Sequence, residues 1–436
     1  MISTKSRSAF RVCGLVMGLS AVSVSGQSTG GAPSAALGTF GVSGASNSTP
    51  SLAASGQTVA AVWTAAKDGS TNLYFALSND GGATFSAPRR VNDQEGDAGA
   101  TPEQPPRVVI SGSGNARTIT VLWSKRDPGP QNSRRDTVRV ARSTDGGRTF
   151  SAARLIHDPA FGGARGWQSL TLGPDGTIHA VWLDGRNAAR QIESAKMAGM
   201  EHKGKPPQEI FYATLGPDGP AVETRIASDV CFCCKTAVAV DARGMVYTAW
   251  RHIFPGSVRD IAFAKSTDGG RRFSPIVRVS NDNWELNGCP EDGPALAVDQ
   301  SGTIHIAWAT VVNDGEPQKA VFYATSRDGK VFSPRKRVPT TGTTTPGHPQ
   351  LLVNADGSAV IVFDEVAGGQ RRVSLVGMSG SGVFQPPQTL SGDESAVHPV
   401  LVRSGARDLL IAWTSRPTTG GSSAPSQIRL KRVTVG

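Results

Sequence analysis

The sequence predicts an all-β fold, a β-propeller of four-stranded blades, from three observations. The chain has 436 residues, of which 51 are Gly and 28 are Pro, and 38% are hydrophobic, a composition typical of many short strands joined by turns. An apolar hairpin recurs along the chain and ends each time in Trp or Phe. A second motif, built from Asp and Gly, follows several of these hairpins. The repeat is longer than the roughly 20 to 45 residues of a solenoid unit and fits one propeller blade.

The first 26 residues have the pattern of a secretory signal peptide. Lys5, Arg7 and Arg11 precede a mostly apolar stretch, residues 12–24, and small residues follow. We therefore expect a signal peptide at residues 1–26, a flexible leader at residues 27–36 and a single propeller domain at residues 37–436. The protein is then periplasmic or secreted. No later apolar run reaches the roughly 18 residues that a membrane helix needs, so no membrane span is predicted.

Seven hairpins make up the main repeat. Residues alternate between apolar and polar along their strands, as expected for strands that are packed between neighbouring blades. Four copies are plain and three looser copies end at Trp63, Trp123 and Trp413; the plain copies are Ser169–Trp182, Ala237–Trp250, Ala295–Trp308 and Gln350–Phe363. Seven hairpins predict seven blades, with six as the alternative.

The last blade lacks one strand in the sequence pattern. After Trp413 only one further strand, Gln427–Val435, is predicted, whereas a blade needs two after its hairpin. The segment Leu37–Val42 lies just ahead of the first hairpin and has the pattern of a strand. We expect this N-terminal strand to complete the last blade and to close the ring, which removes an open sheet edge.

The second motif occurs four times in register with the hairpins. Its Asp accepts hydrogen bonds from turn amides, its glycines allow positive φ, and its aromatic residue packs beneath the turn. The copies are Ser78–Phe85, Ser143–Phe150, Ser266–Phe273 and Ser326–Phe332. These copies resemble the Asp box, or BNR repeat, of sialidases. The resemblance implies a turn between the two outer strands of a blade, which performs no chemistry in that family, and sialidases have six blades.

A closer resemblance is to uncharacterised exported bacterial proteins that combine Asp boxes with a Cys-x-Cys-Cys element and a downstream Gly-Cys-Pro. In this chain the two elements are Cys231–Cys234 and Gly288–Pro290. The resemblance covers most of the chain after the leader. It implies the fold and brings no established reaction.

The loops that lead into the inner strands of the blades, here called the mouth loops, gather the residues with chemistry. They are expected on the face opposite the Asp boxes, around the central channel. The candidate metal ligands fall in the mouth loops of four successive blades and are Cys231, Cys233, Cys234, Cys289, His348 and His398. Thiolates and imidazoles favour copper or zinc over hard cations. The sequence thus predicts a soft-metal site, copper before zinc, or a reactive thiol site.

Structural disulfides are the alternative for these cysteines. Exported proteins usually oxidise their cysteines in pairs. Cys233 and Cys234 are adjacent and do not readily pair, so the segment has only Cys289 as a distant partner and at most one long-range bridge forms easily. The three interpretations stay open. A long insertion, residues 184–208, adds Met197, Met200 and His202, whose sulfurs would suit Cu(I).

The sialidase resemblance implies a glycoside hydrolase with three arginines, an acid and a Tyr nucleophile activated by Glu. All four tyrosines fall on predicted strands, so no catalytic residue is identified and enzyme activity stays open. An exo-sialidase and a non-catalytic carbohydrate- or protein-binding module remain alternative functions. The candidate residues for a small anionic ligand or glycan are Trp167, Arg186, Arg251, Arg259, Glu291 and Asp292.

The formal net charge of +10 does not predict a nucleic-acid surface. The basic residues are scattered over predicted turns and strand edges and form no continuous stripe. We expect no nucleic-acid partner and a monomeric protein.

Overall fold

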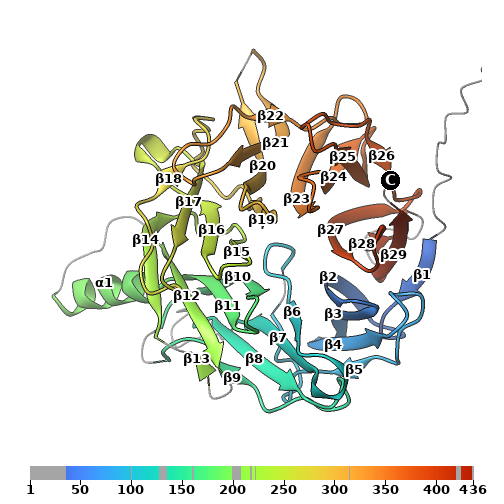
Figure 1. The fold of residues 1–436 in the computed structure, drawn as a ribbon. Helices are drawn as coiled ribbons and strands as arrows, with labels where there is room; N and C mark the ends of the chain where they lie inside the picture. The colour runs from blue at the N-terminus through green and yellow to red at the C-terminus, as the bar shows by residue number, and fades with distance from the viewer. Residues whose placement is uncertain are drawn as a thin grey trace, which may run out of the picture. The chain divides into compact units, whose positions relative to one another are not determined.

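The computed structural model describes residues 36–99, 101–126, 135–159, 162–198, 208–216, 219–220, 222–313, 315–418 and 424–434. The predicted signal peptide, and all of the leader except Ala36, lie outside these residues. Residues 34–436 form one compact unit. Within that unit seven antiparallel sheets surround a central axis (Figure 1), which confirms the predicted all-β fold and the count of seven blades.

The first four blades begin with the strand nearest the axis and continue outward along the chain. Blade 3 has two short outer segments, which both pair with its third strand. The strands are β2 (Ser46–Ser55), β3 (Thr58–Lys67), β4 (Ser70–Ser78) and β5 (Arg89–Arg90); β6 (Arg107–Ser111), β7 (Thr118–Lys125), β8 (Thr137–Ser143) and β9 (Arg154–Leu155); β10 (Arg165–Leu172), β11 (Ile178–Asp184), β12 (Gln208–Gly216), β13 (Gly219–Pro220) and β14 (Thr224–Val230); and β15 (Ala237–Val240), β16 (Val246–Arg251), β17 (Ile261–Ser266) and β18 (Val277–Arg278).

Blades 5 and 6 repeat this order, and blade 7 takes its outermost strand from the N-terminal part of the chain. The strands are β19 (Ala295–Val298), β20 (Ile304–Val312), β21 (Gln318–Ser326) and β22 (Lys336–Arg337); β23 (Thr345–Val353), β24 (Ala359–Ala367), β25 (Gln370–Met378) and β26 (Gln388–Thr389); and β27 (Ser395–Arg403), β28 (Asp408–Arg416), β29 (Gln427–Thr434) and β1 (Ala36–Phe40).

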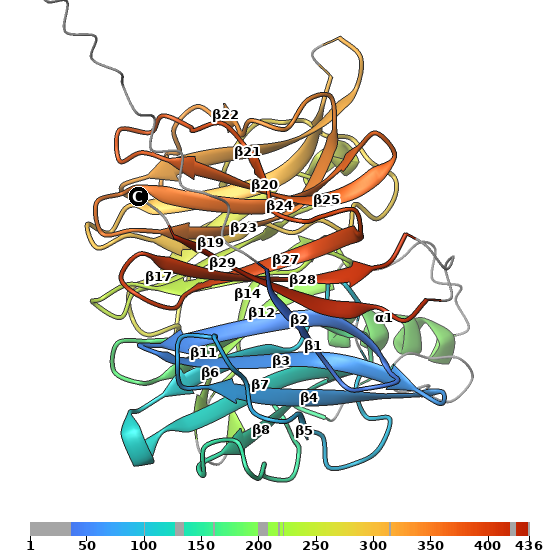
Figure 2. The same ribbon diagram turned by 90° about the vertical axis from the view of Figure 1, so that its right-hand side faces the viewer.

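The strand β1 closes the ring as predicted. It pairs antiparallel with β29, so that Thr39 lies opposite Arg429 and Phe40 lies opposite Ile428. Figure 2 shows β1 lying beside the strands of blade 7. The Phe40 ring packs edge-on against Trp63 of blade 1, with ring centroids 4.9 Å apart. One short strand therefore joins the first and last blades.

The hairpin-ending aromatic residues form the packing between blades. Trp63, Trp182, Trp250 and Trp308 are fully buried. Trp308 of blade 5, for example, belongs to a cluster that includes the buried side chains of blade 4. Each such aromatic side chain removes roughly 150 to 250 Å² of surface from water. Neighbouring blades are therefore held together mainly by apolar contacts between the faces of their sheets.

The Asp-containing turns stabilise the outer part of the blades by local hydrogen bonds. In the copy that joins β8 to β9, Asp145 Oδ1 accepts the backbone N–H of Thr149 at 3.0 Å and Oδ2 accepts its hydroxyl at 2.6 Å. These hydrogen bonds hold the pKa of Asp145 well below its usual range. Gly147 has φ of +85°, and a Cβ there would lie 2.0 Å from the Phe75 ring. The position therefore requires glycine.

The long insertion after β11 contains the helix α1 (Arg186–Met197), which lies at the outside of blade 3 (Figure 1). Met197 at its end is 86% exposed. Met200 and His202, the other residues that the sequence analysis considered for Cu(I), lie outside the described residues. No helix among the described residues is long and apolar enough to cross a membrane.

His157 is buried as a neutral ring, and this predicts acid sensitivity. Its Nε2 accepts the N–H of Val138 at 3.1 Å, which a protonated ring could not do. Burial, with a smaller contribution from the charge of Arg165, lowers the pKa of His157 to about 4. Between pH 6.5 and 4 the unfolded chain binds a proton that the folded chain does not, so stability falls as the pH falls through this window.

Between pH 7 and pH 4.5 the free energy of unfolding should fall for the unchanged protein and for His157→Gln. We expect this fall to be about 2 kcal/mol smaller for His157→Gln, because the variant has no imidazole to titrate. Urea unfolding at the two pH values measures this difference. Parallel losses in both proteins would mean that His157 does not titrate in this window.

Candidate functional site

Four of the mouth loops share a backbone feature at equivalent positions. Thr49, Trp167, His348 and His398 all have φ of +52° or +53°. In each case the pairing of the inner strand with its neighbour shifts register at this point, which is a β-bulge. Left-handed backbone is costly for residues other than Gly, so its repetition in four blades marks positions that the surrounding structure holds in place.

The mouth loops meet at a narrow cavity on the axis. Its volume is about 20 Å³. The lining residues come from blades 1, 2, 4, 6 and 7 and are Thr49, Pro50, Pro102, Glu103, Pro105, Arg107, Lys235, His348, Gln350, His398, Pro399 and Val400. The predicted convergence of these loops around the channel is thus observed.

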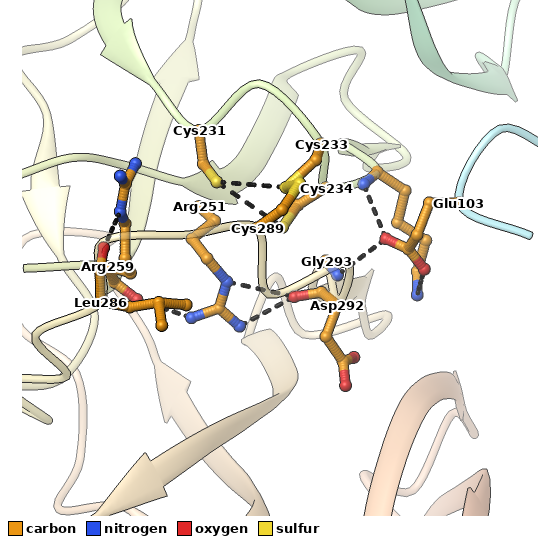
Figure 3. Close-up of a disulfide and its surroundings, with 11 residues drawn as sticks. Glu103, Cys231, Cys233, Cys234, Arg251, Arg259, Leu286, Cys289, Asp292 and Gly293 are labelled. Atoms are coloured by element: carbon orange, nitrogen blue, oxygen red, sulfur yellow. Dashed lines mark hydrogen bonds and ion pairs between the residues drawn. A yellow bond between two sulfur atoms is a disulfide. The ribbon is translucent and has the colours of Figure 1, made fainter.

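The four cysteines among the described residues, Cys231, Cys233, Cys234 and Cys289, lie together beside this cavity, between blades 4 and 5 (Figure 3), and are called here the cysteine centre. Cys233 and Cys289 form a disulfide, which is the one long-range bridge that the sequence readily allows. Cys231 and Cys234 are free thiols and are buried. The Cys231 Sγ lies 3.7 Å from the Cys233 Sγ and 3.9 Å from the Cys234 Sγ. Cys289 is exposed, so the centre is reached from its side.

The two free thiols differ in their affinity for protons. A hydrogen bond from Cys234, together with the charges of Arg251 and Arg259, lowers the pKa of Cys231 to about 7, although burial opposes this shift. Burial raises the pKa of Cys234 well above its usual value, and the hydrogen bond to Cys231 adds to the rise. Cys231 is therefore the member of the pair that loses its proton first.

Arg251 is buried beneath the cysteine centre, and its donors bond to backbone carbonyl groups. Its Nε and Nη2 donate to the Asp292 carbonyl at 3.1 and 2.8 Å. Its Nη1 donates to the Arg259 carbonyl at 2.6 Å, and Nη2 also donates to the Ala309 carbonyl at 2.6 Å. The guanidinium group therefore joins blades 4 and 5. Arg259 is also buried, and its Nε donates to the Leu286 carbonyl at 3.1 Å.

A second group of ligand-type side chains lies on the axis itself. Glu103, His348 and His398, called here the axial site, each offer one ligand atom, and these atoms lie within 4.8 Å of one another. The two imidazole rings have centroids 4.0 Å apart. Asp364 lies behind them: its Oδ2 is 2.8 Å from His348 Nδ1 and accepts the backbone N–H of His398 at 2.7 Å.

Proton affinities in the axial site diverge. Burial disfavours the charged form of His348, but Asp364 and Asp292 outweigh it and raise the pKa of His348 to about 9. Burial and the neighbouring His348 lower the pKa of His398 to about 3. The two rings thus differ strongly although they occupy equivalent places in adjacent blades.

Asp292 connects the two centres. Its side chain is fully buried, accepts the backbone N–H of His348 at 2.9 Å and pairs with Lys319 at 2.9 Å. Its carbonyl oxygen accepts the two bonds from Arg251. Lys319 and His348 contribute to holding the pKa of Asp292 far below its usual value despite burial.

The other predicted ligand-binding residues are more dispersed. Trp167 is buried against the cysteine centre, and its carbonyl accepts the hydroxyl of Thr236 at 2.8 Å. Glu291 is exposed beside the disulfide loop. Arg186 starts α1 at the outside of blade 3, where it pairs with Asp184 and Glu223, both at 2.6 Å. The binding roles assigned to these residues from the sequence stay predictions.

Sequence reasoning placed all six candidate metal ligands around the channel but did not separate them into two centres. It also missed Glu103 and Asp364 as partners of the histidines. Asp364 directly follows Phe363 within β24, so a charged residue after a hairpin-ending aromatic is the signal that could have identified it. Glu103 stands among prolines in a loop without periodicity and gave no comparable signal.

Tyr212, Tyr247 and Tyr323 are buried within their blades. Tyr212 and Tyr323 bond to buried histidines, His179 and His305, at 2.6 and 2.5 Å. Burial raises the pKa of both phenols above their usual range and that of Tyr247 to about 12. None of these phenols lines the axial cavity.

Comparison with known proteins identifies a fold and no family. No family model matches the chain, and no curated protein matches it. An ulvan lyase, a polysaccharide lyase solved with a bound saccharide, is 12% identical over 92% of this chain and 96% of its own, with a TM-score of 0.59.

Two further structures give the same result. A second polysaccharide lyase is 11% identical, covering 89% of this chain and 90% of its own, with a TM-score of 0.56. A protein of unknown function from Dyadobacter fermentans is 14% identical over 78% of this chain and 97% of its own, with a TM-score of 0.51. At these identities the likeness establishes a shared propeller architecture and nothing about the ligand.

Proposed function

We propose that the protein is an exported propeller that binds a soft metal ion, Cu(I), at the cysteine centre, with Cys231 and Cys234 as the primary ligands. One observation carries the proposal. Two buried thiols of a Cys-x-x-Cys pair, free of any disulfide, have their sulfurs 3.9 Å apart. With metal–sulfur bonds of about 2.3 Å, two thiolates at a trigonal metal stand about 4.0 Å apart.

The third ligand position has a candidate within the same segment. The Sγ atoms of Cys231, Cys233 and Cys234 all lie within 4.8 Å of one another. Cys233 is bonded to Cys289, so it becomes a ligand only after this disulfide is reduced. Two thiolates, those of Cys231 and Cys234, are available in the oxidised protein, and reduction of the disulfide adds those of Cys233 and Cys289.

The surroundings suit an anionic metal–thiolate group. Two thiolates with Cu(I) carry one net negative charge, and a buried charge needs compensation. Arg251 and Arg259, both buried, interact electrostatically with Cys231. Apolar neighbours such as Trp167 and Trp250 limit water at the sulfurs and favour a soft ion over strongly hydrated cations.

Cu(I) binding is tested by competition with a chromophoric Cu(I) chelator, with ascorbate to hold copper reduced. We expect one Cu(I) per chain. Cys231→Ser and Cys234→Ser should each weaken Cu(I) binding by at least about 100-fold. Loss of a residue that only hydrogen-bonds to a metal ligand already lowers metal affinity roughly 10- to 100-fold, and loss of a ligand itself should cost more.

Cys289→Ser is the matched control, since it removes a cysteine and the disulfide from the same centre but leaves both primary ligands. It should bind Cu(I) at least as tightly as the unchanged protein because it frees Cys233. Equal binding by Cys231→Ser, or a purified protein in which Cys231, Cys233, Cys234 and Cys289 are all oxidised, would refute the proposal.

A small anionic ligand or glycan stays a prediction from the sequence. The axial cavity, at about 20 Å³, has no room for a sugar ring. Such a ligand would have to lie above the mouth loops, and its binding would be indifferent to Cys231→Ser.

A further inference from the structure

The axial site differs from the cysteine centre in ligand type, position and size. Its cavity of about 20 Å³ is close to the volume needed for one water molecule, roughly 10 to 15 Å³. It therefore admits a single ion with at most a water and excludes an organic ligand. Glu103, His348 and His398 lie in its wall and supply one oxygen and two nitrogen ligand atoms.

Glu103 presents one carboxylate oxygen to the cavity and is fixed by the other. Its Oε2 accepts the backbone N–H groups of Lys235 at 3.0 Å and Gly293 at 3.2 Å. Among the described residues, Oε1 is buried and accepts no hydrogen bond. Figure 3 shows the Glu103 carboxylate between the loop that carries the cysteines and the loop that carries Gly293. A buried carboxylate oxygen without a donor is the atom that a cation would stabilise.

The histidines are arranged as metal-binding histidines are. The His348 Nδ1 is engaged by Asp364 at 2.8 Å, which leaves Nε2 for a ligand. A carboxylate behind an imidazole fixes the tautomer and the ring orientation and is the usual partner of a metal-bound histidine. The same carboxylate oxygen accepts the N–H of His398. One buried aspartate therefore orients both histidine positions, each of which has left-handed backbone.

We propose that Glu103, His348 and His398 bind a divalent cation of the Zn²⁺ class on the propeller axis, at a centre separate from the cysteines. Two imidazoles and one carboxylate suit Zn²⁺ and similar first-row ions, whereas Mg²⁺ and Ca²⁺ prefer oxygen ligands alone. Ligand atoms about 2.1 Å from a metal lie about 3.4 Å apart in a tetrahedron, so small side-chain rotations close the site. Three protein ligands leave a fourth position for water.

Lys235 competes with this cation for Glu103, and Arg107, which also lines the cavity, interacts electrostatically with the same carboxylate. The Lys235 Nζ lies 3.8 Å from Glu103 Oε1, and the Lys235 side chain is buried. The ammonium group partly compensates the carboxylate in the absence of a metal and must move when a metal binds. Lys235→Met should therefore strengthen Zn²⁺ binding, by about 10-fold, because it removes a positive charge close to the ion.

The test measures Zn²⁺ affinity by competition with a chromophoric zinc chelator, in the otherwise complete protein with Cys231→Ser and Cys234→Ser so that thiols do not contribute. We expect one Zn²⁺ per chain. His348→Gln, His398→Gln and Glu103→Gln should each weaken binding by at least about 100-fold, and Asp364→Asn by about 10- to 100-fold. Glu316→Gln removes an exposed acidic residue elsewhere and should change nothing.

Co²⁺ absorption in the protein with all cysteines present distinguishes the two centres. A spectrum without a thiolate charge-transfer band, lost in His398→Gln, supports the axial site. A strong thiolate band that disappears in Cys231→Ser, with no remaining Co²⁺ absorption that depends on His398, would assign the ion to the cysteine centre alone and overturn the proposal. So would Zn²⁺ binding that is insensitive to all three ligand substitutions.

A direct measurement on the unchanged protein avoids any dependence on the folding of variants. Crystals soaked in Zn²⁺ should show an anomalous peak between Glu103 and the two histidines. No peak there at saturating Zn²⁺ would mean that Asp364 and Lys235 simply compensate His348 and Glu103 as ion pairs, and the proposal would fail.

Discussion

A chain that starts at Ser43, and so lacks β1, is expected to lose at least about 3 kcal/mol of unfolding free energy relative to a chain that starts at Ser34. The loss has two sources. The antiparallel pairing of β1 with β29 disappears, and the Phe40 ring no longer packs against Trp63 and Phe85. Removal of a large buried aromatic side chain alone typically costs about 3 kcal/mol or more, and part of Phe40 is exposed, so the backbone pairing makes up the remainder.

Urea unfolding of the two chains measures this loss. The shortened chain should also self-associate, because β29 becomes an open edge that can pair with another chain. A synthetic peptide of residues 34–43 should restore stability in trans, and the same peptide with Thr39→Pro should not, because proline removes a donor and fits poorly in a paired strand. Equal stability of the two chains would mean that β1 does not close the ring.

Arg251→Met is expected to destabilise the protein by about 3 to 5 kcal/mol. The substitution removes four hydrogen bonds and leaves the carbonyl groups of Asp292, Arg259 and Ala309 without these donors. An unsatisfied buried polar group costs about 1 to 3 kcal/mol. Arg251→Lys should recover little, because an ammonium group cannot reproduce the planar fork of donors.

Arg259→Met is the matched control for this prediction. Arg259 is also buried, but among the described residues its side chain makes one hydrogen bond, to the Leu286 carbonyl, so the expected loss is about 1 to 2 kcal/mol. Urea unfolding under oxidising conditions compares the two. If Arg251 instead serves mainly to bind an anionic ligand, as the sequence suggests, Arg251→Met would reduce ligand binding while leaving the unfolding free energy nearly unchanged.

The fold was predictable because its signals are local and repeated. Alternation along the hairpins gives the strand faces, the aromatic residues at their ends mark the blades, and a strand pattern at residues 37–42 stands where blade 7 lacks one. The observed strand, Ala36–Phe40, differs from this range by one or two residues at each end. The helix α1 was not predicted, since its sequence has only Ile192 and Met197 as large apolar residues and packs little of its surface.

The sequence predicted which residues lie at the candidate site but not how they are arranged there. Strand order places Cys231, Cys289 and His348 at one mouth, but distances across a channel depend on how each bulge turns its side chain. A shift of one residue at Gly347 or Val397 would direct different side chains to the axis. For the same reason the sequence could not show that Arg251 bonds to carbonyl groups of the neighbouring blade, which depends on the spacing of blades 4 and 5.

The repeated bulge makes the mouth of the channel modular. Each of the four blades that has the bulge contributes one side chain on left-handed backbone, and the sheets behind it do not depend on which side chain that is. Chemistry at the axis can therefore change one blade at a time during evolution, with the scaffold intact. Asn adopts left-handed backbone more readily than most residues. His348→Asn would therefore remove an imidazole from the axis and leave the loop conformation intact. Thr49, in the equivalent place of blade 1, shows that a residue without an ionisable group is accommodated there.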